Sequence, residues 1–116
     1  MTAGTYNIVI EQGVHYVQDI LYKDHNDEPI SLDGWSGKMQ IRKSYNSPDV
    51  IFEFSTDNGK MKLNNPTGNI RLEAGFEDTR KLDFDTAVYD IDLTNIEGVP
   101  IRILQGTVTL SREVTR

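Results

Sequence analysis

The chain has 116 residues, a formal net charge of −6 and no cysteine. This length suits one domain spanning residues 1–116, and the absence of cysteine excludes disulfides, thiolate metal sites and a cysteine nucleophile. The acidic charge balance lacks the basic face that nucleic-acid phosphates require, and no apolar run approaches the roughly 18 residues of a membrane span, so we expect neither a nucleic-acid nor a membrane partner.

The N-terminal half predicts strands in which apolar and polar residues alternate. Residues 5–11 (TYNIVIE) place their even-numbered apolar side chains on one face. Residues 15–23 (HYVQDILYK) carry apolar side chains at both parities, which predicts a strand that is covered on both faces or bulged. After a polar loop, residues 29–44 (PISLDGWSGKMQIRKS) turn at their glycines and then alternate strictly. This change of pattern predicts a corner followed by a strand that starts at Gly37.

The C-terminal half predicts further strands separated by turns. Asp57-Asn58-Gly59 tolerates the positive φ angles of a tight turn and predicts a hairpin between the runs VIFEFST and KMKLN. In the last run, PIRILQGTVTLSREVTR, the apolar residues move from odd to even positions. This parity shift predicts a bulge or bend near Gln105-Gly106.

The whole pattern predicts an all-β fold. About eight short strands are separated by turn signals, and no convincing amphipathic helix occurs. The irregular residues 76–86 (FEDTRKLDFDT) predict a short helical turn, with Phe76, Leu82 and Phe84 plugging one end of the core. We therefore expect a single antiparallel β-sandwich of two packed sheets, immunoglobulin-like in type rather than a barrel.

The titratable residues show no spacing typical of a catalytic or metal site. His15 and His25 stand in separate segments, and neither a G-x-S-x-G nor an H-E-x-x-H motif is present. The loop DHNDE at 24–28 offers alternate oxygen ligands but lacks the central glycine and distal glutamate of a calcium-binding EF-hand. A hydrogen-bonded polar turn explains the same residues. We predict no catalytic, cofactor-binding or metal-binding residue and no cofactor.

Two further features have competing interpretations. Four aspartates could supply a carboxylate pair for glycoside hydrolysis: Asp83, Asp85, Asp90 and Asp92. The last two lie on the polar side of a predicted strand, where a solvated face is the default. Trp35 could stack on a sugar ring beside Tyr45, but the glycines around it favour an indole that folds into the core.

Several segments resemble small structural proteins of tailed bacteriophages and prophages. The most specific is PISLDGWSGKMQIR at residues 29–42, which is similar to a P-I-x-L-x-G-aromatic segment followed by an MQIR strand. TYNIVIEQG and YVQDILYKD precede it in the expected order. TGNIRLEAG, AVYDIDLT and RILQGTVTLSREVTR are similar to the closing hairpin and tail of that group. The chain departs from the pattern at GVHYVQD, which is more polar, and at FEDTRKLDFDT, which replaces a plainer segment.

The resemblance implies a non-enzymatic virion component, associated with the tail or baseplate, that acts by assembly. Its implied partners are other phage tail or baseplate proteins, or further copies of this chain in a homo-oligomer. Its implied location is the virion tail, with the host cytoplasm during assembly. Because sheet edges offer unpaired N–H and C=O groups, we expect docking through residues 5–10 and 109–116. The alternative is a carbohydrate-binding or adhesin domain that uses Trp35, Tyr45 and the loop at 24–28 on a host-surface glycan.

Overall fold

The computed structural model of the chain describes residues 4–23, 26, 28, 30–64 and 68–114. Within these residues it contains nine β-strands and one short helix. In chain order they are β1 (Gly4–Thr5), β2 (Ile8–Glu11), β3 (Tyr16–Leu21), β4 (Ser36–Arg42), β5 (Phe52–Ser55), β6 (Met61–Asn64), β7 (Asn69–Ala74), α1 (Phe76–Arg80), β8 (Thr86–Thr94) and β9 (Pro100–Ser111).

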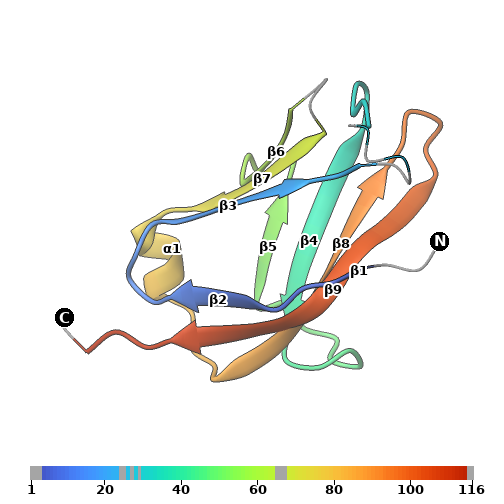
Figure 1. The fold of residues 1–116 in the computed structure, drawn as a ribbon. Coiled ribbons are helices and arrows are strands. Elements are labelled where there is room, and N and C mark those ends of the chain that lie inside the picture. The colour runs from blue at the N-terminus through green and yellow to red at the C-terminus, as the bar shows by residue number, and fades with distance from the viewer. Residues whose placement is uncertain (1–3, 24–25, 27, 29, 65–67, 115–116) are drawn as a thin grey trace.

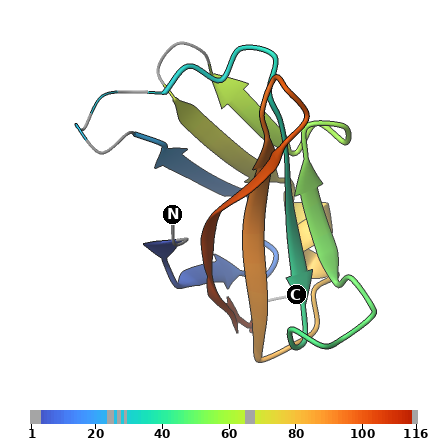
Figure 2. The same ribbon diagram turned by 90° about the vertical axis from the view of Figure 1, so that its right-hand side faces the viewer.

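The strands form two sheets that pack against each other as a sandwich (Figures 1 and 2). The larger sheet has the order β1-β9-β8-β4-β5, with β2 also paired to β9, and the smaller sheet has the order β3-β7-β6. Inward-facing apolar side chains of both sheets form the core, among them Met39, Ile41, Ile70, Leu72 and Ile91. The alternating runs of the sequence therefore do fold as a two-sheet, all-β sandwich.

The larger sheet is mixed, whereas the sequence predicted antiparallel sheets. β1 and β2 run parallel to β9, with Gly4 opposite Leu104 and Ile8 opposite Val108, and the remaining neighbours are antiparallel. Alternation sets which face a side chain takes but not the direction of its neighbouring strand. The predicted number of about eight strands differs from the nine described because the first predicted strand is divided at Tyr6.

The turn at Asp57-Asn58-Gly59 crosses between the sheets and does not close a hairpin. β5 belongs to the larger sheet and β6 to the smaller one. The Asn58 side-chain oxygen accepts hydrogen bonds from the N–H groups of Ser55 (3.0 Å) and Lys60 (2.9 Å), and Gly59 has a φ of 79°. The sequence thus locates the turn correctly, but the chemistry of the turn does not decide which sheet the next strand joins.

The irregularity predicted in the last run is a bulge at Ile103, two residues before the predicted position. Asp92 pairs with Arg102 and Ile91 with Leu104, so Ile103 is the extra residue. The bulge turns Leu104 toward the core while Arg102 stays on the outer face of the larger sheet, opposite Asp92.

Neither interpretation of residues 15–23 is correct. β3 pairs regularly with β7 over its whole length, without a bulge. Tyr16 is buried, whereas Val17 and Leu21 are 42% and 59% exposed on the uncovered outer face. The apolar residues at both parities therefore mark an exposed apolar surface and not a strand covered on both sides.

The predicted helical turn is α1. Leu82 and Phe84, which follow it, are buried as expected, but Phe76 is half-exposed. The guanidinium carbon of Arg80 lies 5.3 Å from the centre of the Phe76 ring, a cation–π contact on the surface.

Candidate interaction surfaces

The two segments predicted to dock partners pair with each other. β2 lies along the end of β9, from Ile8 opposite Val108 to Glu11 opposite Ser111, and its two isoleucines are buried. Each segment therefore contributes one face to the core. Only the outer edge of β1 and β2 is left for a partner strand, and residues 115–116 lie outside the described residues.

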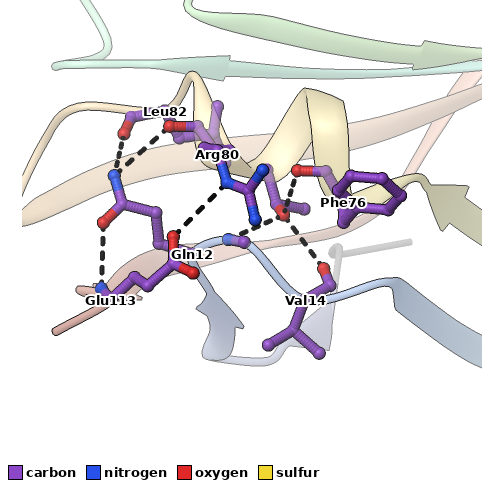
Figure 3. Close-up of polar contacts among 8 residues, drawn as sticks. Gln12, Val14, Phe76, Arg80, Leu82 and Glu113 are labelled. Atoms are coloured by element: carbon purple, nitrogen blue, oxygen red, sulfur yellow. Dashed lines mark hydrogen bonds and ion pairs between the residues drawn. The ribbon is translucent and has the colours of Figure 1, made fainter. Parts of the chain in front are cut away.

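A glutamine attaches the segment after β9 to the body of the sandwich (Figure 3). The Gln12 side-chain nitrogen donates to the carbonyl of Leu82 at 2.9 Å, and its oxygen accepts from the Glu113 N–H at 2.9 Å. Arg80 Nε also lies 3.5 Å from a carboxylate oxygen of Glu113. The chain beyond β9 is thus fixed beside α1 as far as Glu113.

A buried threonine of α1 fixes the turn between β2 and β3 against the same helix. The Thr79 side chain is 1% exposed, and its hydroxyl accepts from the Gly13 N–H at 3.0 Å. The hydroxyl donates to the carbonyl of Val14 at 2.9 Å, with the carbonyl of Phe76 farther away at 3.3 Å. This contact holds the start of β3 at a defined position relative to β2.

One flank of the sandwich carries an edge strand from each sheet. β2 and β3 diverge from their connecting turn on the same side of the molecule (Figures 1 and 2). The exposed apolar side chains of residues 6–21 define what we call the β2–β3 flank: Tyr6, Val9, Val14, Val17 and Leu21. Val9, 61% exposed, lines a hollow of about 290 Å³ together with Val14 and Val17. Edge strands in monomeric proteins are usually protected by charges, proline or bulges, so this apolar flank is suited to contact with another chain.

The charged groups beside the flank are held in pairs on the outer face of the smaller sheet. His15 Nε2 lies 2.7 Å from a carboxylate oxygen of Glu73, and Arg71 Nε lies 3.2 Å from Asp19. Asn69 also donates to Asp19 at 3.2 Å. The hydrogen bond from Asn69, followed by that from Arg71, lowers the pKa of Asp19 and keeps its carboxylate ionised.

A polar hollow of about 360 Å³ lies on the outer face of the larger sheet, next to the exposed ring of Tyr45. Its charged lining consists of Arg42, Asp90, Asp92 and Arg102. This hollow combines an aromatic face with carboxylates and guanidinium groups, the side chains that recognise polar ligands.

Arg102 connects the two aspartates of the hollow. Its Nε lies 3.4 Å from a carboxylate oxygen of Asp90 and 3.4 Å from one of Asp92. Burial, and then the charge of Asp92, raise the pKa of Asp90, against the opposing effect of Arg102. Asp83 and Asp85 lie elsewhere, on Arg112 at 2.9 and 3.2 Å. The four aspartates therefore form two separate pairs.

Trp35 and Tyr45 do not form one site. Trp35 is half-buried, and its ring packs edge-on against Tyr22 with centroids 6.3 Å apart. β4 separates the two aromatic residues along the chain, and a strand of its seven residues is roughly 23 Å long. This placement agrees with the interpretation of Trp35 as a core residue and leaves Tyr45, 64% exposed, on its own.

The polar loop at 24–28 is described only at Asn26 and Glu28, both exposed. Asp24, His25 and Asp27 lie outside the described residues, so the loop contributes no geometry to a site. Among the residues that the structure does describe, no group of three or more His, Asp or Glu side chains is arranged to hold a metal ion.

The sequence did not predict the exposed outer face of β3, the alignment of Arg102 with Asp90 and Asp92, or the separation of Tyr45 from Trp35. The first had a signal in the apolar residues at both parities of residues 15–23. The parity shift in the last run indicated a bulge but not the side chains that it aligns. Within the described part of the chain, no helix has the length and apolarity of a membrane span.

No protein-family model matches this chain, and no curated protein matches it. Extracellular domains 3–5 of Drosophila OTK are similar in structure, with 14% identity, a TM-score of 0.39 and coverage of 90% of this chain. CopC from Methylosinus trichosporium OB3b has 10% identity, a TM-score of 0.42 and coverage of 85% of this chain and 99% of its own. The chain spans 32% of the OTK structure. These similarities identify no family.

Proposed function

We propose that this chain is a non-enzymatic structural component of a phage virion, a tail- or baseplate-associated module that acts through protein–protein contacts. The observation that carries the proposal is the β2–β3 flank, where β2 and β3 each have one edge without a neighbour among the described strands, and the exposed side chains of Val9, Val14 and Val17 line one hollow. A partner strand at such an edge gains backbone hydrogen bonds and buries apolar surface at the same time. The resemblance of PISLDGWSGKMQIR and RILQGTVTLSREVTR to phage structural proteins supports the setting.

The proposed fold type is immunoglobulin-like, and the strand order supports it. In variable-type immunoglobulin sandwiches, strands C′, C, F and G are neighbours in one sheet, and B, E and D are neighbours in the other. The orders β5-β4-β8-β9 and β3-β7-β6 follow the same sequence of neighbours. β1 and β2 lie beside β9 and not beside β3, so strand A of the second sheet has no counterpart among the described residues.

The proposed partners are other tail or baseplate proteins, or further copies of this chain, in the virion tail and earlier in the host cytoplasm. The test is affinity capture of the tagged chain from a lysate of the infected or lysogenic host, read by mass spectrometry. We expect tail or baseplate proteins in fixed stoichiometry, and the chain itself in density-purified virions.

A flank variant makes this test specific. Val9→Glu combined with Val17→Glu places two charges on the flank, and Ile96→Glu places one at a more exposed position in the turn between β8 and β9. We expect the double variant to lose the tail proteins and the Ile96 variant to retain them. Equal recovery with all three proteins would show that the flank is not the docking surface, and absence of the chain from purified virions would reject the virion role.

A second candidate is binding of a host-surface glycan at the polar hollow beside Tyr45. The favouring observation is an exposed aromatic ring next to Asp92 and Arg102, a combination that can stack on a sugar and hydrogen-bond its hydroxyls. Binding to immobilised host polysaccharide tests it. Tyr45→Ala should abolish retention and Tyr6→Ala, on the other flank, should not. Equal retention of both variants would place any glycan elsewhere.

A further inference from the structure

The free edge of β3 presents a defined set of backbone groups. Along a strand, the N–H and C=O groups of successive residues point alternately to the two neighbours. Tyr22 donates its N–H to Gly68, just before β7, so the even-numbered residues of β3 face β7. The N–H and C=O groups of Val17, Asp19 and Leu21 therefore point to the other side, where the described part of the smaller sheet has no strand.

The interior next to this edge is incompletely covered. Gln18 and Ile20 point inward from β3 but are only half-buried, and Leu104 of the facing sheet is also half-buried. In the four-stranded sheet of an immunoglobulin-type sandwich, one further strand lies beside the strand equivalent to β3. A strand added there would cover these inward side chains and pair the backbone groups of Val17 and Leu21 and the Asp19 N–H; the Asp19 carbonyl already accepts from Gln18 Nε2 at 3.3 Å.

The outward side of the same edge sets the charge of the strand that fits. Asp19 lies between the exposed side chains of Val17 and Leu21. Arg71 contacts its carboxylate at 3.2 Å from the β7 side, which leaves the side toward the free edge to a partner, and Glu11 lines the neighbouring hollow on the β2 side. A second copy of the chain, paired antiparallel so that Val17, Asp19 and Leu21 of each β3 face the partner strand, would place Asp19 opposite Asp19. Like charges directly opposite destabilise a strand pair, and the chain as a whole carries −6.

We propose that the free edge of β3 is an acceptor site for an extended strand of a partner protein, with apolar residues facing the core and a lysine or arginine opposite Asp19. This inference rests on the proposed assembly function and names the kind of partner segment and the strand that receives it. It also places the docking contact on β3, outside the two terminal segments that the sequence predicted.

The test uses the whole chain and a defined probe. The probe is an acetylated and amidated heptapeptide of alternating valine and lysine, and its counterpart carries glutamate in place of lysine. Binding is followed by NMR titration of the 15N-labelled protein and by hydrogen exchange of the backbone amides. At saturation we expect the lysine peptide to slow exchange at Val17, Asp19 and Leu21 at least tenfold, and the glutamate peptide to bind at least threefold more weakly.

Two substitutions at Asp19 separate backbone pairing from charge. Asp19→Pro and Asp19→Ala both lose the charge of Asp19 and its contacts with Asn69 and Arg71, but only Asp19→Pro also removes an N–H, one that points to the free edge and not to the ladder with β7. We expect the proline variant to bind at least tenfold more weakly than the alanine variant. Asp19→Lys keeps every backbone donor and tests the charge even if the proline variant does not fold. It should reverse the preference between the two peptides.

Three results would overturn the proposal: no binding at millimolar peptide, protection at an edge other than β3, or a dimer of the chain alone that forms through β3 in sedimentation and NMR. Failure of the strand-acceptor proposal can be told apart from failure of the assembly function. Capture of tail proteins that is unchanged by Asp19→Pro would leave the assembly role standing and remove only the strand-acceptor site. If the peptide binds at β3 but the chain is absent from purified virions, the strand-acceptor site stands and the virion role is rejected.

Discussion

Replacing the buried hydroxyl of Thr79 by a methyl group should weaken the attachment of the β2–β3 turn to α1. Thr79→Val keeps the side-chain shape but leaves the Gly13 N–H and the Val14 carbonyl without their partner at 3.0 and 2.9 Å. Each bond contributes about 1 kcal/mol net, and groups left unpaired in a buried setting add to the loss. We expect a decrease of about 2–3 kcal/mol in the free energy of unfolding.

Urea unfolding followed by circular dichroism and Trp35 fluorescence measures this decrease. With a slope of about 1.5 kcal/mol per molar urea, the midpoint should fall by roughly 1–2 M. Thr79→Ser is the matched control, because it keeps the hydroxyl and loses one methyl group, at about 1 kcal/mol. The reasoning is refuted if the valine variant is as stable as the parent, or if the serine variant loses more stability than the valine variant.

The remaining predictions concern the backbone and the polar hollow. A Cβ atom on Gly106 would lie 2.1 Å from the Tyr6 carbonyl oxygen, so Gly106→Ala should displace β1 and destabilise by about 2–3 kcal/mol in urea unfolding. Gly59→Ala meets no atom within 4 Å and should cost only about 1 kcal/mol for its φ of 79°. The raised pKa of Asp90 means that ionisation disfavours the fold, so stability falls as pH rises from 3.8 through the folded pKa. Asp90→Asn should therefore raise the free energy of unfolding at pH 7 relative to the unsubstituted chain, and the difference should vanish near pH 3 in urea unfolding. Equal effects at both pH values would contradict this reasoning.

The sequence predicted the faces of the strands well because side-chain parity is a local property. Met39 and Ile41 in β4, and Ile70 and Leu72 in β7, are buried as their alternation requires. Strand neighbours are a non-local property, and parity carries no information about them. For this reason the parallel pairing of β2 with β9 was not predictable from the residues alone.

The candidate surfaces were less predictable than the fold. Terminal placement suggested residues 5–10 and 109–116 as docking segments, yet Ile8, Ile10 and Leu110 of these segments lie in the core. The hollow beside Tyr45 depends on the bulge at Ile103, which aligns Arg102 with both aspartates. A one-residue insertion of this kind shifts the parity pattern in the sequence but does not reveal which side chains it brings together.

The parallel pairing of β1 and β2 with β9 has a mechanical consequence. Gly4 lies beside Leu104 and Glu11 beside Ser111, so the chain enters the pair at one end and leaves it at the other (Figure 1). Tension applied at the two ends of the chain pulls these strands past each other along their length. Their hydrogen bonds then resist together in shear and do not open one after another, a geometry that suits a part through which a larger assembly transmits force.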